Sequence, residues 1–128
     1  MDSVVHFEIP ADNPNRASKF YKDAFGWNVQ KWDGPNPYWM LGTTESDENG
    51  IPKSSGSING GMGKREAPLR SIVVTISVPD IEKALQKVER SGGKTVSKKE
   101  AVGDMGFAAY FKDSEGNVVG LFQPSGRM

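Results

Sequence analysis

The feature that most constrains this chain is an internal repeat. Shifting the sequence by 67 positions aligns residues that serve the same predicted role in each half. The aligned pairs are Ile9 with Ile76, Ala17 with Ala84, Gly26 with Gly93, and Val29 with Val96. In this order, the pairs lie at an inward-facing strand position, on the apolar face of a predicted helix, at the residue that ends the helix, and in the following strand. Because a repeat at a fixed offset indicates a repeated supersecondary unit, the sequence predicts two copies of one strand–helix–strand module.

The first half carries the signals of a strand, a helix and three further strands. Residues 4–10 alternate as a half-buried strand does, which places His6 and Glu8 on the same face. Asp12-Asn13-Pro14 supplies a cap and a first-turn proline, and Gly26 ends the helix. We predict the further strands at residues 27–32, 38–42 and 57–62, with a polar loop at 43–55.

The second half repeats this plan after a connection at residues 60–70. Residues 71–78 alternate, Pro79-Asp80 opens a helix, and Gly92-Gly93 ends it. Further strands are predicted at residues 95–97, 107–111 and 118–123. The sequence thus predicts one α+β domain over residues 1–128, with module one at about 4–62 and module two at about 71–124. Each module is a βαβββ unit, and we expect the two mixed sheets to curl around a cleft with the helices on the outer faces.

The composition excludes several classes of function. Sixteen Lys and Arg residues balance sixteen Asp and Glu residues, and the sequence lacks a basic stripe of the kind that binds nucleic acid. The chain has no cysteine, which excludes disulfides, thiolate zinc sites and cysteine nucleophiles. No apolar run approaches the roughly 20 residues of a membrane span, and the N-terminus lacks the pattern of a secretion signal. We therefore expect a cytoplasmic protein without nucleic-acid or membrane partners.

Several short motifs accompany this order of elements. In the first half they are His6 on the first strand, Phe20-Tyr21 in the helix and Gly26 after it. In the second half they are Val78-Pro79-Asp80, Ala84, Gly92-Gly93, residues 113–117 and, most specific, the run Gly-Asn-Val-Val-Gly-Leu-Phe-Gln at 116–123. The chain resembles, over residues 4–123, the vicinal-oxygen-chelate superfamily, which includes glyoxalase I, bleomycin-resistance proteins, fosfomycin-resistance proteins and extradiol dioxygenases. It is most similar to the glyoxalase-related single-domain branch.

In metal-dependent members of this superfamily, the resemblance implies two ligands from each half. His6 matches the first-strand position, but its repeat mate is Val73, and Gly120 stands where an acid is expected. The remaining ligand would come from Asn59 or Ser57. Nickel, zinc, manganese or iron(II) would need imidazole or carboxylate donors at these positions. We therefore expect an incomplete metal site in which His6 is the main candidate ligand.

The candidate site residues belong to the faces that the helices leave open. His6 is the sole histidine, and its unperturbed pKa suits a ligand contact or a proton carrier; a hydrogen-bonded surface histidine is the alternative. Glu8 shares the face of His6, so the two could act as a base and its orienter, and a solvated surface acid is the alternative. Aromatic rings on an open face would line an apolar pocket. The predicted ligand contacts are His6, Trp39, Ser71, Thr75 and Phe107.

Two classes of function follow from these features. One is metal-free binding of a small organic molecule, as in bleomycin-resistance proteins, with the loop 43–55 as a gate. The other is an enzyme, either a metal-dependent lyase or isomerase of the lactoylglutathione-lyase type, in which a carboxylate moves the proton, or a dioxygenase. Under both hypotheses the open sheet edges predict a homodimer, with modules paired within one chain or exchanged between chains.

Overall fold

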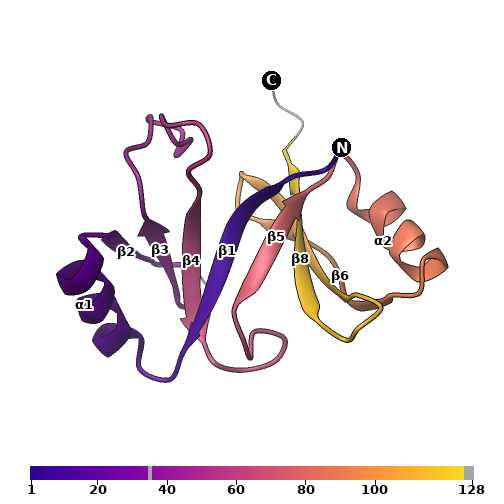
Figure 1. Cartoon of the computed structure of the whole chain (residues 1–128), viewed down its shortest axis with the longest axis horizontal. Coiled ribbons are helices and arrows are strands. Elements are labelled where there is room, and N and C mark those ends of the chain that lie inside the picture. The colour runs from indigo at the N-terminus through magenta and orange to yellow at the C-terminus, as the bar shows by residue number, and fades with distance from the viewer. Residues whose placement is uncertain (35, 126–128) are drawn as a thin grey trace. The chain divides into compact units, whose positions relative to one another are not determined.

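The computed structural model describes residues 1–34 and 36–125, which form ten helices and strands (Figure 1). In chain order these are β1 (Val4–Ala11), α1 (Pro14–Phe25), β2 (Asn28–Trp32), β3 (Tyr38–Gly42), β4 (Asn59–Lys64), β5 (Val73–Ser77), α2 (Ile81–Arg90), β6 (Lys94–Val102), β7 (Gly106–Lys112) and β8 (Val118–Pro124). The chain divides into a first module, His6–Ile72, and a second module, which joins Met1–Val5 to Val73–Met128. The predicted α+β class with two βαβββ modules is confirmed.

In the first module, the strand order is β2-β3-β4-β1. The β1–β4 pair is parallel, and the other two neighbouring pairs are antiparallel. Helix α1 lies on one face of this sheet (Figure 1), where an apolar cluster holds it. The buried members of the cluster are Ala11, Trp39, Leu41 and Met62, and Phe7, Ile9, Ala17, Trp27 and Val29 pack around them. Because side chains alternate along a strand, the residues between these positions belong to the opposite face.

Helix α1 begins and ends where the sequence predicts. The Asn13 side chain accepts a hydrogen bond from the backbone N–H of Arg16 at 3.0 Å, and Pro14 is the first helical residue. This is a standard N-cap, because the side chain satisfies one of the N–H groups that a helix start leaves without a partner. Gly26 ends the helix at a φ of 73°, and its N–H donates to the carbonyl of Lys22 at 2.9 Å. A glycine suits this left-handed position because it has no Cβ.

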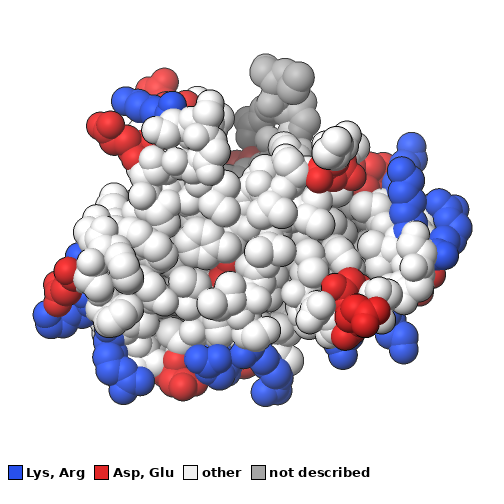
Figure 2. All heavy atoms as spheres, in the orientation of Figure 1, with Lys and Arg blue, Asp and Glu red and all other residues white. Residues whose placement is uncertain are grey.

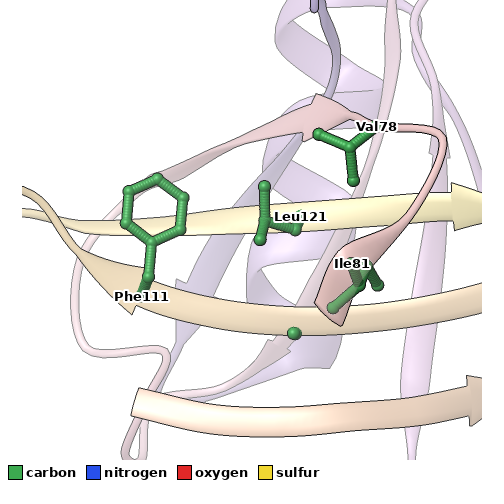
Figure 3. Close-up of a cluster of buried hydrophobic side chains, with 5 residues drawn as sticks. Val78, Ile81, Phe111 and Leu121 are labelled. Carbon is green, nitrogen blue, oxygen red and sulfur yellow. The ribbon is translucent and has the colours of Figure 1, made fainter. Parts of the chain in front are cut away.

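The second module repeats this topology in the strand order β5-β8-β7-β6. The β5–β8 pair is parallel, and the β7–β8 and β6–β7 pairs are antiparallel. Asp80 caps α2 by accepting from the N–H of Lys83 at 3.0 Å. The core of the module is a buried cluster of Val78, Ile81, Ala109, Phe111 and Leu121. Figure 3 shows Ile81, the first residue of α2, beside Leu121 of β8, with Phe111 of β7 on the other side of Leu121.

The strand boundaries differ from the predictions at polar strand ends. β4 extends to Lys64, so part of the predicted connection 60–70 is a strand. β6 covers Lys94–Val102 instead of residues 95–97, and its pairing with β7 shifts register twice. These segments carry lysines and glycines, so they lack the apolar alternation that signals a strand. In the described part of the chain, no helix is long and apolar enough to cross a membrane.

Candidate functional site

Three polar side chains meet on the face of the first module opposite its apolar cluster. His6 and Glu8 alternate on β1 with Phe7 and Ile9, which pack on the helix side. Tyr38, the first residue of β3, alternates in the same way with the core residue Trp39. His6 and Tyr38 are half-buried, and Glu8 is only 8% exposed. We refer to His6, Glu8 and Tyr38 as the polar triad.

Tyr38 links the other two members of the polar triad. Its hydroxyl group donates a hydrogen bond to Oε2 of Glu8 at 2.8 Å, and it lies 3.4 Å from Nε2 of His6. A hydrogen bond to a carboxylate is stronger than one between neutral groups, and it offsets part of the cost of burying the charge. The three groups therefore form one continuous hydrogen-bonded chain across two strands that are not adjacent in the sheet.

Gly61 makes room for this chain. It lies opposite Glu8 in the parallel β1–β4 pair. A Cβ atom on Gly61 would stand 1.8 Å from the hydroxyl oxygen of Tyr38 and 2.2 Å from its Cζ. No side chain fits at such distances, so the tyrosine ring can reach over β4 to Glu8 only because residue 61 is a glycine. The triad is thus built from a third strand as well as from β1 and β3.

Burial sets the charge state of His6. Desolvation lowers the pKa of the imidazole below its ordinary value of 6.5, and the nearby Glu8 carboxylate raises it by a smaller amount. The neutral imidazole is consequently the dominant form of His6 near neutral pH. A neutral imidazole is both a hydrogen-bond donor and an acceptor, one at each ring nitrogen.

Two aromatic residues predicted as ligand contacts lie on the helix side of their sheets. Trp39 is 7% exposed within the apolar cluster of the first module. Phe107 packs against the buried cluster of the second module, and Nζ of Lys99 lies 4.3 Å from its ring centroid. Both rings pack with the apolar clusters on the helix sides of their sheets, and their role as ligand contacts stays a prediction.

The two predicted hydroxyl contacts occupy different settings. Ser71 is exposed and precedes β5, whose first residue is Val73. Thr75 is 7% exposed and lies opposite Gly120 in the β5–β8 pair. A Cβ atom on Gly120 would come within 2.8 Å of the Thr75 hydroxyl oxygen. Thr75 is the repeat mate of Glu8, but it belongs to the second module, and its role in ligand binding stays a prediction.

Sequence reasoning missed Tyr38 as a site residue, although a signal for it was present. Tyr38 and Trp39 are adjacent in a strand and so must face opposite sides of the sheet. Trp39 and Leu41 are two large, mainly apolar side chains two residues apart, as expected for a core face. Tyr38 carries a hydroxyl group that a fully apolar core would leave unpaired. That difference is a weak sequence signal in favour of Tyr38 as the residue on the polar face.

The donor set does not fit a nickel, zinc, manganese or iron site of the expected kind. Val73 and Gly120 offer no donor atom. The Asn59 side chain is engaged elsewhere: its Oδ1 accepts from the N–H of Thr43 at 2.9 Å, and its Nδ2 donates to Ser46 Oγ at 2.8 Å. Within residues 1–34 and 36–125, no three His, Cys, Asp or Glu side chains are grouped so that they could hold a metal ion. Such metals normally require at least three protein donors.

Charged side chains gather away from the central strands of the first module. In Figure 2 they are visible over the loop between β3 and β4, at the upper left, and over α1, at the left. The surface visible over β1 and β4 is mainly uncharged. A predominantly uncharged surface with a few polar groups is typical of sites for small organic molecules.

The family of the chain follows from comparison with known proteins. A model of the Glyoxalase/Bleomycin resistance protein/Dioxygenase superfamily matches residues 3–121. The chain belongs to this superfamily. The resemblance to the vicinal-oxygen-chelate group that the sequence motifs indicated is therefore confirmed. A glyoxylase-like domain-containing protein from Didymella fabae is 30% identical over 118 residues, which cover 90% of this chain and 88% of that protein.

Solved structures show the same fold at low sequence identity. A hypothetical protein from Bacillus halodurans is 14% identical with a TM-score of 0.70, covering 99% of this chain and 97% of its own. The methylmalonyl-CoA epimerase from Mycobacterium tuberculosis is also 14% identical, with a TM-score of 0.64 and coverage of 94% of this chain and 87% of its own. Identities this low establish a shared fold and leave the function to be argued from the site.

Proposed function

We propose that this protein binds a small organic molecule without the help of a metal ion, at the polar triad of the first module. The observation that carries the proposal is the hydrogen-bonded chain from His6 through Tyr38 to Glu8, on the sheet face that α1 leaves uncovered. Gly61 is needed to form this chain. A buried polar network of this kind fixes the orientation of a ligand because its donors and acceptors are already in place.

An exposed methionine on the face of the triad supports an organic ligand. Met40 follows Tyr38 by two residues on the same face of β3, and its side chain is 37% exposed. A flexible thioether beside polar groups provides an adaptable apolar contact, particularly for aromatic rings. The superfamily adds support, since its name joins two kinds of enzyme, glyoxalases and dioxygenases, with bleomycin-resistance proteins.

A histidine-selective NMR screen tests the proposal directly. His6 is the only histidine, so protein labelled at histidine with ¹³C and ¹⁵N gives the ring signals of one residue. We expect some members of a library of small neutral aromatic compounds to shift these signals in a saturable way. Tyr38→Phe should weaken the binding about tenfold, because it removes the hydroxyl group that links His6 to Glu8.

Tyr21→Phe is the matched control for this screen. It removes a hydroxyl group from a tyrosine of α1, which stacks on Trp27 on the helix side of the same sheet, and compounds that bind the triad should keep their affinity for this variant. A library that leaves the His6 ring signals unchanged at millimolar concentrations would contradict the proposal. Hits with equal affinity for the wild type and the Tyr38→Phe variant would show that they bind somewhere else.

A metal titration separates this proposal from the metal-dependent lyase hypothesis. Chelator-treated protein is titrated calorimetrically with nickel, zinc, manganese and iron(II), in parallel with the His6→Ala variant. We expect no binding at micromolar concentrations, because the described residues do not group three suitable donors. Micromolar binding that His6→Ala abolishes would instead support a metal site and a lyase or isomerase activity.

A further inference from the structure

We infer that His6 presents Nδ1 as a hydrogen-bond acceptor to the ligand, and that the ligand is therefore an aromatic or enolic hydroxyl compound that donates its O–H to this nitrogen. The inference rests on the proposed function, because it places the ligand at the polar triad. It goes further by naming the chemical group that the triad recognises and by giving Tyr38 a positioning role.

The direction of the hydrogen bonds fixes where the His6 proton lies. A tyrosine hydroxyl group has a single proton, and Tyr38 donates it to the Glu8 carboxylate. The oxygen of Tyr38 can then only accept from Nε2 of His6, which lies 3.4 Å away. Nε2 must therefore carry the proton, and in a neutral imidazole Nδ1 is left with its lone pair.

Nδ1 of His6 is not completely buried. In the part of the chain that the structure describes, no fully buried side-chain nitrogen or oxygen lacks a hydrogen-bond partner. The hydrogen bond of His6 is made by Nε2, so Nδ1 keeps at least a small exposed area. An accessible acceptor at the end of a buried polar chain is suited to a ligand that brings a donor.

The chain of hydrogen bonds favours an acidic donor over a weak one. When Nδ1 accepts a proton partially, positive charge develops on the imidazole and Nε2 becomes a stronger donor to Tyr38. Tyr38 in turn becomes a stronger donor to the Glu8 carboxylate, so each bond of the chain reinforces the next. Burial, which keeps the imidazole neutral, preserves the acceptor form. A phenolic or enolic O–H, which is more acidic than an aliphatic O–H, gains most from this arrangement.

Two probes that differ only in the donor test the inference. 4-Nitrophenol carries a phenolic O–H and 4-nitroanisole replaces it with a methyl ether, while the rest of the two molecules is the same. Binding is followed on the His6 ring signals in slightly acidic buffer, where the phenol is not ionised. We expect the phenol to bind about tenfold more tightly than the ether, and we expect the ¹⁵N resonance of Nδ1 to move with the phenol alone.

The variants assign the preference to individual groups. His6→Phe should abolish the difference between the two probes. Tyr38→Phe should reduce it, because without the hydroxyl group nothing holds the proton on Nε2, and its free protein should show a mixture of the two imidazole tautomers. Tyr21→Phe, the matched control on the helix side of the sheet, should keep the full preference for the phenol.

Each other outcome contradicts a specific step. Equal binding of both probes with shifts at His6 would overturn the hydroxyl class and leave the proposed function intact. The same holds if neither probe binds while other library compounds shift His6. A free protein with the proton on Nδ1 would refute the inferred hydrogen-bond direction. If no compound of any kind shifts His6, the proposed function itself fails.

Discussion

The two modules share a topology and a helix-covered core, but their uncovered faces differ. Each places a glycine of its last strand opposite a buried polar residue of its first strand. In the first module Gly61 lies opposite Glu8, and in the second Gly120 lies opposite Thr75. Among the described residues, Glu8 and Thr75 are the buried polar side chains, and they are repeat mates. Both modules thus pair a buried polar residue with a glycine, but the polar group is a carboxylate in the first module and a hydroxyl in the second.

The difference between the modules lies in the third strand. Tyr38 lies two residues before Met40, which pairs with Gly61. Ala108 lies two residues before Tyr110, which pairs with Gly120. Tyr38 and Ala108 therefore hold matching places in β3 and β7. A tyrosine there reaches the first strand, whereas an alanine cannot. The first module consequently carries the complete polar triad, whereas in the described part of the second module the matching residue is Ala108, whose side chain has no polar group to reach Thr75.

The largest effect that we predict tests the assignment of aromatic rings to the cores. Trp39→Ala removes a ring that is 7% exposed, and such truncations cost about 3–5 kcal/mol of unfolding free energy. Phe107→Ala should cost less, because that ring is half-buried. Urea denaturation with an unchanged slope measures both losses. A loss below about 1 kcal/mol for Trp39→Ala, accompanied by loss of ligand binding, would instead restore Trp39 as a ligand contact.

A second prediction compares the two glycines. Gly61→Ala forces the Tyr38 ring to move, because the new Cβ would overlap its Cζ as well as its hydroxyl oxygen. Overpacking of this kind costs about 1–3 kcal/mol, and we expect the upper end. Gly120→Ala meets the Thr75 hydroxyl oxygen at 2.8 Å and other atoms of Thr75 at 3.5 Å or more, so a small adjustment relieves it.

Two measurements check the glycine comparison. Urea denaturation gives the loss of unfolding free energy for each variant, and the His6 ring signals report whether the triad has been disturbed. Gly61→Ala should change those signals and Gly120→Ala should leave them unchanged. Equal losses of unfolding free energy for the two variants would contradict this prediction, because the position of the Tyr38 ring would then not explain why residue 61 is a glycine.

The fold could be predicted from the sequence because its signals are local. Asn13 before Pro14, Gly26 after the first helix and Asp80 before the second each mark a helix end through one residue's own chemistry. The 67-residue repeat then supplied the module order. Strand ends were harder, as β6 shows. Its half-buried positions Thr95, Ser97 and Lys99 are polar, so most of the strand lacks the apolar alternation that would reveal it.

The site was predicted only in part, because it depends on long-range contacts. The alternation along β1 was enough to place His6 and Glu8 on one face. The link between them comes from Tyr38, which lies 30 residues from Glu8 in the sequence and reaches it across β4. Whether Tyr38 or Trp39 lies on the same face as His6 and Glu8 depends on which face of the sheet α1 covers. That tertiary fact has only a faint trace in the sequence.

A third prediction compares Glu8 with Thr75, the buried polar residues at matching positions of the two modules. Glu8→Gln keeps the shape of the side chain but removes its charge, which weakens the bond from Tyr38, and we expect a cost of about 1–2 kcal/mol. Thr75→Val keeps the shape of the side chain but removes a neutral hydroxyl group, and we expect a smaller cost of about 0.5–1 kcal/mol. Urea denaturation ranks the two variants. Glu8→Gln should also lower the pKa of His6 further, because the carboxylate is what raises it. A greater loss for Thr75→Val would place the more important polar contact in the second module.

The smallest effect that we predict is a pH dependence that belongs to His6. Its pKa is lowered on folding, so between 6.5 and the folded value the unfolded chain binds more protons than the native protein. The contribution of His6 to the free energy of unfolding should therefore be fully present above about pH 7 and should decline as the pH falls below 6.5. His6→Gln should remove this part of the pH dependence, and the difference between wild type and variant isolates it.

The pH scan must separate His6 from the carboxylates. The pKa values of Glu89 and Asp113 are held below their ordinary values of 4.5 and 3.8 by hydrogen bonds from Thr95 and from Asn117. Their contributions are present above those ordinary values and are lost only as the pH falls through the lower folded values. Thermal unfolding between about pH 5 and pH 8 therefore reports chiefly on His6. A wild type and a His6→Gln variant with parallel profiles over this range would mean that His6 is not desolvated, and the neutral acceptor at the triad would lose its physical basis.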